Sequence, residues 1–190
     1  MLGALLAAAL AAAACGPAAT PSPTYTAVPV GPTVWPAGTT GQYGLRIEPS
    51  LLGRLPSTVD AYRLAEDTIT EHAALDDPEL PKIFDNYAAA TIGAVGSENW
   101  LVVVIAHFNP ENQNPDAYDT WVGTWFTSAC SQADGVGATA QEQIGDWLTD
   151  TATCKGGPQV YVVILSDYTV VSTLGGGPRD LGRKLIPALR

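Results

Sequence analysis

Basic side chains are scarce in this chain of 190 residues. It has nine lysines and arginines against nineteen aspartates and glutamates, which gives a formal net charge of −10. Nucleic acid and anionic lipid headgroups both bind clustered Lys and Arg, and the sequence contains no run of basic residues. We therefore expect no nucleic-acid partner, and the acidic excess is typical of a soluble surface.

Histidine and cysteine, which carry much nucleophilic and metal chemistry, are also few. The chain has two histidines, His72 and His107, and three cysteines. It contains no GxSxG or HExxH motif and no phosphate-binding loop ending in Gly-Lys-Ser/Thr. We therefore predict a protein that is not an enzyme and that uses no metal or cofactor. A hydrolase with a noncontiguous active site that includes His107 is the alternative.

No apolar run is long enough to cross a bilayer as a helix. Residues 1–14 (MLGALLAAALAAAA) have no polar side chain. As a helix they would span roughly 21 Å, against about 30 Å for the hydrocarbon core of a membrane. Their length is typical of the apolar region of a signal peptide. Because no Lys or Arg precedes the run, either the free amino terminus supplies the positive charge or the true start lies upstream of Met1.

The residues that end this run, 12–16 (AAACG), resemble the lipobox of bacterial lipoproteins. Small residues precede Cys15 and a glycine follows it, although the family usually has Leu or another large aliphatic residue where this chain has Ala12. The resemblance implies that a signal peptide of residues 1–14 is removed and that Cys15 carries diacylglyceryl and palmitoyl chains. The same residues also suit ordinary signal cleavage, which would leave Cys15 at a free terminus of a secreted protein.

The positions of the three cysteines favour lipidation. Cys130 and Cys154 both lie in the region predicted to fold. Exported proteins normally oxidise their thiols, so we expect these two to form a disulfide and Cys15 to be left over. The alternative, a zinc site completed by His107 or carboxylates, lacks paired-cysteine spacing. The sequence therefore predicts a protein of the cell envelope, held to the extracytoplasmic side of the membrane by a lipid anchor.

Residues 15–41 predict an extended tether that begins at the lipidated cysteine. The segment holds six prolines and no charged residue, and the first charge in the chain is Arg46. Such a composition buries too little apolar surface to fold and favours extended, polyproline-like backbone. We therefore place a single domain at residues 42–190.

The pattern of residues 42–190 predicts an α+β domain. The stretch WLVVVIAHF, residues 100–108, is apolar on both faces, which is typical of a central strand. A helix over 115–129 begins at Asn114, and its apolar stripe, which includes Trp121 and Trp125, indicates core packing more than a ligand-stacking surface. Further elements are expected as short helices at 68–75 and 79–86, strands at 87–95, 138–144, 147–154, 159–165 and 169–174, and a helix at 179–189 that Pro187 ends early.

This order, short helices followed by ββ-α-ββββ-α, predicts an antiparallel sheet with helices packed on one face. A non-catalytic binding or structural domain is the favoured function, with an unidentified protein or small molecule as the ligand. If His107 is hydrogen-bonded to a carboxylate beside an open cleft, the hydrolase alternative gains support. If His107 is sealed in the core, that alternative is excluded.

Overall fold

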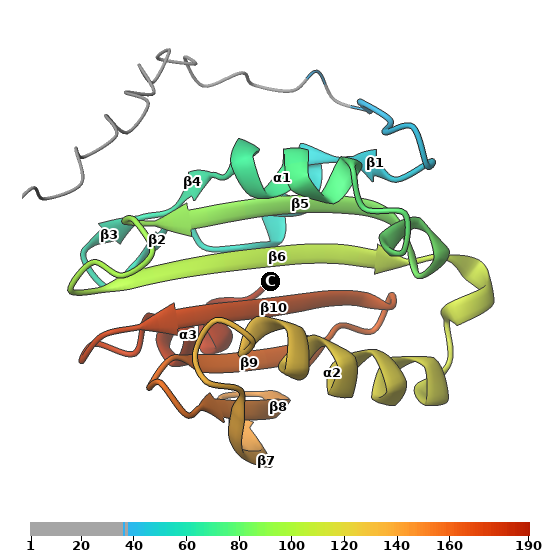
Figure 1. The fold of residues 1–190 in the computed structure, drawn as a ribbon. Coiled ribbons are helices and arrows are strands. Elements are labelled where there is room, and N and C mark those ends of the chain that lie inside the picture. The colour runs from blue at the N-terminus through green and yellow to red at the C-terminus, as the bar shows by residue number, and fades with distance from the viewer. Residues whose placement is uncertain (1–35, 37) are drawn as a thin grey trace, which may run out of the picture. The chain divides into compact units, whose positions relative to one another are not determined.

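The computed structural model describes residues 36 and 38–190 of the chain (Figure 1). Its eight-stranded sheet is built from β1 (Arg46–Ile47), β4 (Ala65–Glu66), β5 (Phe84–Ile92), β6 (Trp100–Phe108), β7 (Val136–Ile144), β8 (Trp147–Cys154), β9 (Gln159–Ile164) and β10 (Thr169–Gly176). The strand order is β1-β5-β6-β10-β9-β8-β7, and β4 also pairs with β5. All of these pairs are antiparallel except β1 with β5.

The helices, the 3-10 turns and one small hairpin lie outside this sheet. They are α1 (Thr68–Leu75), α2 (Pro115–Ala129), α3 (Leu181–Leu185), the 3-10 turns η1 (Pro49–Arg54), η2 (Leu80–Lys82), η3 (Pro110–Asn112) and η4 (Ile186–Ala188), and a hairpin of β2 (Thr58–Val59) and β3 (Tyr62–Arg63). The predicted α+β class, with a sheet that is mostly antiparallel, is confirmed. The sequence order of the main strands and helices is also as predicted.

The helices do not all lie on one face, which corrects the predicted arrangement. Helices α1 and α2 pack on one side of the sheet, whereas α3, η1 and η4 pack on the other (Figure 1). The reason lies in β6, whose side chains are apolar on both faces and so need a cover on each. Alternate residues serve the two cores, with Val104, Ala106 and Phe108 toward α2 and Leu101, Val103 and Ile105 toward α3.

Helix α2 forms where the sequence predicts it. The Asn114 side chain accepts a hydrogen bond from the Ala117 backbone N–H at 2.9 Å, and Pro115 occupies the first turn. The apolar stripe then packs Trp121 edge-on against Phe84 and Phe108, with ring centroids 5.3 and 5.9 Å apart. These aromatic contacts hold α2 over β5 and β6.

The segment 79–86 is not the helix that the sequence predicts. Only the turn η2 forms there, and β5 starts at Phe84, three residues before the predicted strand. Strand pairing overrides the weak local preference, because Phe84 lies opposite Phe108 and Asn86 lies opposite His107 at the end of β6. The last helix is likewise shorter than predicted, and the chain continues as η4 around Pro187.

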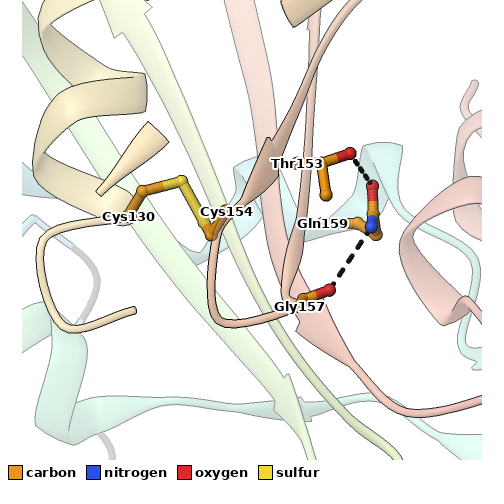
Figure 2. The surroundings of a disulfide bond; sticks show 5 residues. All are labelled: Cys130, Thr153, Cys154, Gly157 and Gln159. Atoms are coloured by element: carbon orange, nitrogen blue, oxygen red, sulfur yellow. Dashed lines mark hydrogen bonds between the residues drawn. A yellow bond between two sulfur atoms is a disulfide. The ribbon is translucent and has the colours of Figure 1, made fainter. Parts of the chain in front are cut away.

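The predicted disulfide between Cys130 and Cys154 is present (Figure 2). Cys130 caps the end of α2, and Cys154 is the last residue of β8, with 5.2 Å between their Cα atoms. Beside the bond, the Thr153 hydroxyl donates to the Gln159 side chain at 2.8 Å across the β8–β9 hairpin. The disulfide therefore ties the far end of α2 to the sheet.

Residues just before the predicted domain boundary are bonded to the domain. The Gly38 backbone N–H donates to Ile47 O at 3.0 Å, and the Ile47 N–H donates to Thr39 O at 2.8 Å. The Gly41 N–H donates to Leu45 O at 2.8 Å. The hydrogen-bonded chain therefore includes residues 38–41, which the sequence assigns to the tether.

Candidate functional site

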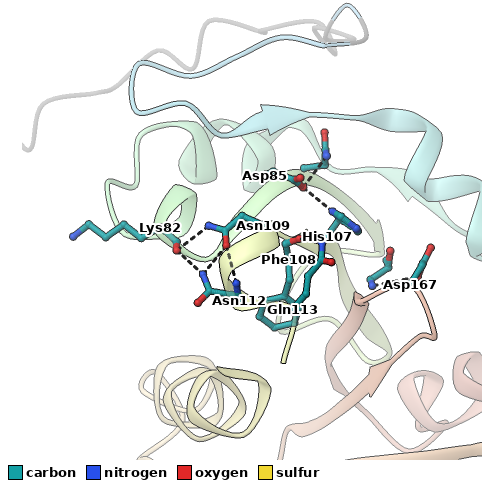
Figure 3. Close-up of polar contacts among 10 residues, drawn as sticks. Lys82, Asp85, His107, Phe108, Asn109, Asn112, Gln113 and Asp167 are labelled. Carbon is teal, nitrogen blue, oxygen red and sulfur yellow. Dashed lines mark hydrogen bonds and ion pairs between the residues drawn. The ribbon is translucent and has the colours of Figure 1, made fainter. Parts of the chain in front are cut away.

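The His107 side chain lies at the carboxyl end of β6 and is hydrogen-bonded to a carboxylate (Figure 3). Its Nδ1 is 2.8 Å from Asp85 Oδ1, and the two side chains are 27% and 40% exposed. The neighbouring Asn86 amide donates to the same Asp85 oxygen at 2.8 Å. Because an ionised carboxylate only accepts, this contact places the proton of the neutral imidazole on Nδ1 and leaves Nε2 with its lone pair.

An ion pair lies beside this contact. Thr169 is directly opposite His107 in the β6–β10 ladder, and its backbone N–H donates to Asp167 Oδ1 at 3.2 Å. Asp167 also pairs with Arg54 of η1. Partial burial disfavours the charge on Asp167, but the Thr169 hydrogen bonds and the Arg54 guanidinium outweigh it and lower the pKa of the carboxyl below its usual value.

In the described part of the chain, this geometry provides a base and an orienting carboxylate, and no hydroxyl or thiol is hydrogen-bonded to the base. Within residues 36 and 38–190, Asp85 is the only hydrogen-bonding partner of the His107 side chain. His107 is not sealed in the core, so the structure does not exclude the hydrolase alternative. The chemistry available to this pair is activation of a bound water at Nε2, which is general-base catalysis.

The amide side chains that follow His107 in the sequence stabilise the loop between β6 and α2. Asn109 and Asn112 each donate to Lys82 O, at 3.0 and 2.8 Å, and Asn112 also donates to Asn109 Oδ1 at 2.7 Å (Figure 3). The Gln113 amide donates to Phe108 O at 3.0 Å. These bonds fasten the β6–α2 loop to η2, so the amide groups are occupied by the fold itself.

A cavity of about 240 Å³ lies between α1 and α2 over the sheet. Most of its wall is apolar and includes Ala73, Leu80, Tyr87, Val102, Trp125 and Leu174. Thr70, Asp77 and Ser128 add polar groups. An apolar pocket with a few polar groups is the usual form of a small-molecule site, although this one is smaller than most.

Trp125 is the unusual residue of this cavity. Its ring stacks on Trp121 at 5.7 Å between centroids, but its indole N–H is buried and has no acceptor within residues 36 and 38–190. A buried donor without a partner is costly, and buried indole groups usually find an acceptor. The sequence predicts both tryptophans as core. Trp121 is buried core, whereas Trp125 packs against the core and also lines the cavity.

Glu71 is a fully buried acid on the same side of the sheet. Its Oε1 accepts the Ala89 backbone N–H at 3.0 Å, which fills the gap between β1 and β4 along β5. Burial raises the pKa of the Glu71 carboxyl to about 7. The Ala89 hydrogen bond opposes this rise, and the charges of Glu66 and Asp67 add to it. Its contacts give Glu71 a structural role.

Two parts of the site are not predicted from the sequence. The sequence predicts Asp85 within a short helix at 79–86, and therefore does not predict its pairing with His107. A partial signal exists, because a hairpin with its turn at 96–99 places residue 88 opposite His107, whereas the observed register, which pairs Ile92 with Leu101, places Asn86 there. The cavity has no comparable signal, since it depends on the spacing of two helices that are far apart in the chain.

No protein-family model, curated protein or solved structure matches the chain. In the described part of the chain, no helix is long and apolar enough to cross a membrane. Residues 36 and 38–190 also contain no group of three or more His, Cys, Asp and Glu side chains placed to hold a metal ion. Cys15 and the predicted signal peptide lie outside the described residues.

Proposed function

We propose that the protein is a bacterial envelope lipoprotein, anchored through Cys15, that displays a non-catalytic binding domain with its ligand site between α1 and α2. The ligand is a small, mostly apolar molecule with one hydrogen-bond acceptor. Trp125 carries the ligand site: it lines a largely apolar cavity, and its buried indole N–H has no acceptor among the described residues.

The anchor is supported by the sequence around Cys15 together with the disulfide. Residues 12–16 resemble a lipobox, and an uncharged segment rich in proline follows them. Because Cys130 and Cys154 pair with each other, Cys15 has no cysteine of its own chain to bond. Acylation accounts for the remaining thiol.

The ligand chemistry follows from the walls of the cavity. Aliphatic and aromatic side chains favour an apolar body, and the Trp125 N–H favours a carbonyl or hydroxyl oxygen beside it. Asp77 disfavours an anionic group at the edge of the cavity. A volume of about 240 Å³ limits the occupant to a small molecule or a single side chain of a larger ligand.

Intact-mass analysis of membrane-extracted protein tests the anchor. We expect the mature chain to begin at Cys15 and to carry a diacylglyceryl or triacyl addition, which Cys15→Ser abolishes. A soluble mature chain without any lipid would contradict the anchor and leave the secreted alternative.

Titration with small apolar amides, followed through the Trp125 indole resonance in NMR spectra, tests the ligand site. We expect binding to shift this resonance, and Ala73→Leu to weaken binding by filling the cavity from α1. Ala94→Leu, a matched change at an exposed alanine in the β5–β6 turn, is the control. Shifts that persist in Ala73→Leu, or that never reach the Trp125 resonance, would place binding elsewhere.

A hydrolase that uses His107 is the second candidate, and the contact of 2.8 Å between His107 and Asp85 favours it. For this function we expect slow hydrolysis of an activated ester such as p-nitrophenyl acetate, with a sharp loss in His107→Ala and Asp85→Asn. Unchanged hydrolysis in both variants would rule out this site.

A further inference from the structure

The outer edge of β7 is open, in contrast to the opposite edge of the sheet. At the opposite edge, the Glu48 N–H donates to Tyr87 O, the Asp67 N–H donates to Ala89 O, and Glu71 accepts the Ala89 N–H. Short strands β1 and β4 complete that cover. Strand β7 ends the strand order, and within the described residues no strand pairs with its outer side (Figure 1).

Alternation along the hairpin identifies the unpaired backbone groups of β7. The turn Gly145-Asp146 joins Ile144 to Trp147, so this pair is the first hydrogen-bonded pair of the β7–β8 ladder. The bonded positions then alternate, which directs the N–H and C=O groups of residues 139, 141 and 143 outward. Outside the β7–β8 ladder, the only backbone group of residues 137–143 that accepts a bond from the described chain is Ala140 O, from the Thr151 hydroxyl of β8.

This edge lacks the features that usually block strand addition. Edge strands are commonly protected by lysine, proline or unpaired charge. Residues 138–143 (ATAQEQ) include none of these except Glu142. Glu142 accepts two hydrogen bonds from the Arg183 guanidinium, at 2.7 and 2.9 Å, so its charge is neutralised from α3. A bulge interrupts only the start of the strand, between Val136 and Thr139.

We propose that β7 pairs with β7 of a second copy of this chain, antiparallel and about a two-fold axis at Gln141, which joins two sheets into one. In this register Thr139 lies opposite Gln143 of the other copy, and about six backbone hydrogen bonds form between the outward groups. The proposal does not depend on the lipid anchor or on the ligand site between α1 and α2.

Charge at the seam favours a second copy as the occupant. Each copy is acidic, but in this register Glu142 lies opposite Ala140 of the other copy, so no carboxylate faces another. Moving the two-fold axis to Glu142 would keep outward groups opposite each other, with residue 141 facing residue 143, but it would place the two Glu142 carboxylates directly opposite each other. The pairing also uses the regular stretch 139–144 and leaves the bulge outside.

Sedimentation velocity on the full chain carrying Cys15→Ser tests the proposal. This substitution removes the one cysteine outside the disulfide and so prevents intermolecular disulfides. We expect a monomer–dimer equilibrium between about 1 µM and about 1 mM, because a single strand pair buries little area. A monomer over this whole range would overturn the proposal, and so would capture of extended peptides at β7 without dimerisation.

Variants at Gln141 test the register. We expect Gln141→Pro, which removes an outward N–H, to raise the dimer dissociation constant by about tenfold or more. Gln141→Lys and Gln141→Glu each place like charges opposite each other, so each alone should dimerise weakly, whereas an equal mixture of the two should recover the dimer. Ala94→Lys and Ala94→Glu, in the distant β5–β6 turn, make the same charge changes as controls. A dimer that all Gln141 variants retain, or a mixture that behaves like its components, would overturn the two-fold β7 pairing.

Discussion

Replacing Glu71 with glutamine tests whether one buried carboxyl group sets the pH dependence of folding. The Glu71 side chain is fully buried, and burial raises the pKa of its carboxyl from near 4.5 to about 7. Glutamine has the same shape, keeps an acceptor oxygen for the Ala89 N–H and never ionises. The second Glu71 oxygen has no partner among the described residues, so the glutamine amide meets the surroundings that the protonated acid already has.

The sign of the effect follows from the raised pKa. Below pH 4.5 the carboxyl is protonated in both the folded and the unfolded chain, so Glu71 adds no pH dependence. Between pH 4.5 and about 7 the folded chain holds a proton that the unfolded chain has released, so the free energy of unfolding falls as pH rises. Above that range Glu71 is charged in both states and its cost is constant. The shift in pKa corresponds to a total loss of about 3 kcal/mol in the free energy of unfolding across this range.

Urea unfolding followed by tryptophan fluorescence, from pH 4.5 to about pH 8, measures this cost. We expect the stability of Glu71→Gln relative to the unsubstituted chain to rise by about 3 kcal/mol across the range, because the other carboxyl groups are common to both proteins. Glu111→Gln, at an exposed glutamate, is the control and should give a curve parallel to that of the unsubstituted chain. Parallel curves for Glu71→Gln would refute the reasoning.

Further substitutions at three places in the fold have expected effects on the free energy of unfolding, each measured by denaturant unfolding. Replacing Cys130 and Cys154 with alanine opens a loop with a sequence separation of 24, and should cost about 3 kcal/mol. Phe108→Ala removes a fully buried ring from the aromatic cluster, and should cost about 3–5 kcal/mol. Tyr118→Phe removes the hydroxyl that donates to Asp150 at 2.7 Å, and should cost about 1.5–3 kcal/mol. In a chain that already carries Asp150→Asn, the same Tyr118→Phe substitution should cost less.

The elements with strong local signals are those that the sequence predicts well. The Asn114-Pro115 start and the apolar stripe specify α2 within a short stretch, and the run 100–108 specifies β6 in the same way. The disulfide also follows from sequence, because Cys130 and Cys154 are the only two cysteines in the folded part. The helix and the strand are therefore specified by residues within their own segments, and the disulfide is specified by the number of cysteines.

The parts that the sequence does not predict depend on tertiary partners. The face that α3 covers is decided by the apolar residues of β6 and β10, which serve two cores at once. The contact between Asp85 and His107 forms because β5 starts early enough to pair with the end of β6. Trp125 lies on the predicted stripe, but whether such a residue is sealed or lines a cavity depends on where α1 lies.

The start of the domain is a further case in which tertiary contact outweighs composition, and Gly41→Ala tests it. A Cβ at Gly41 would lie 2.7 Å from Leu75 O, the backbone at the end of α1, so the added methyl group forces the two segments apart. We expect a loss of about 1–3 kcal/mol in the free energy of unfolding. At Gly53 an added Cβ meets no atom within 4 Å, so Gly53→Ala should change stability little. If Gly41→Ala is as stable as Gly53→Ala, residues 38–41 contribute nothing to the fold and the domain begins near Gln42, as composition alone suggests.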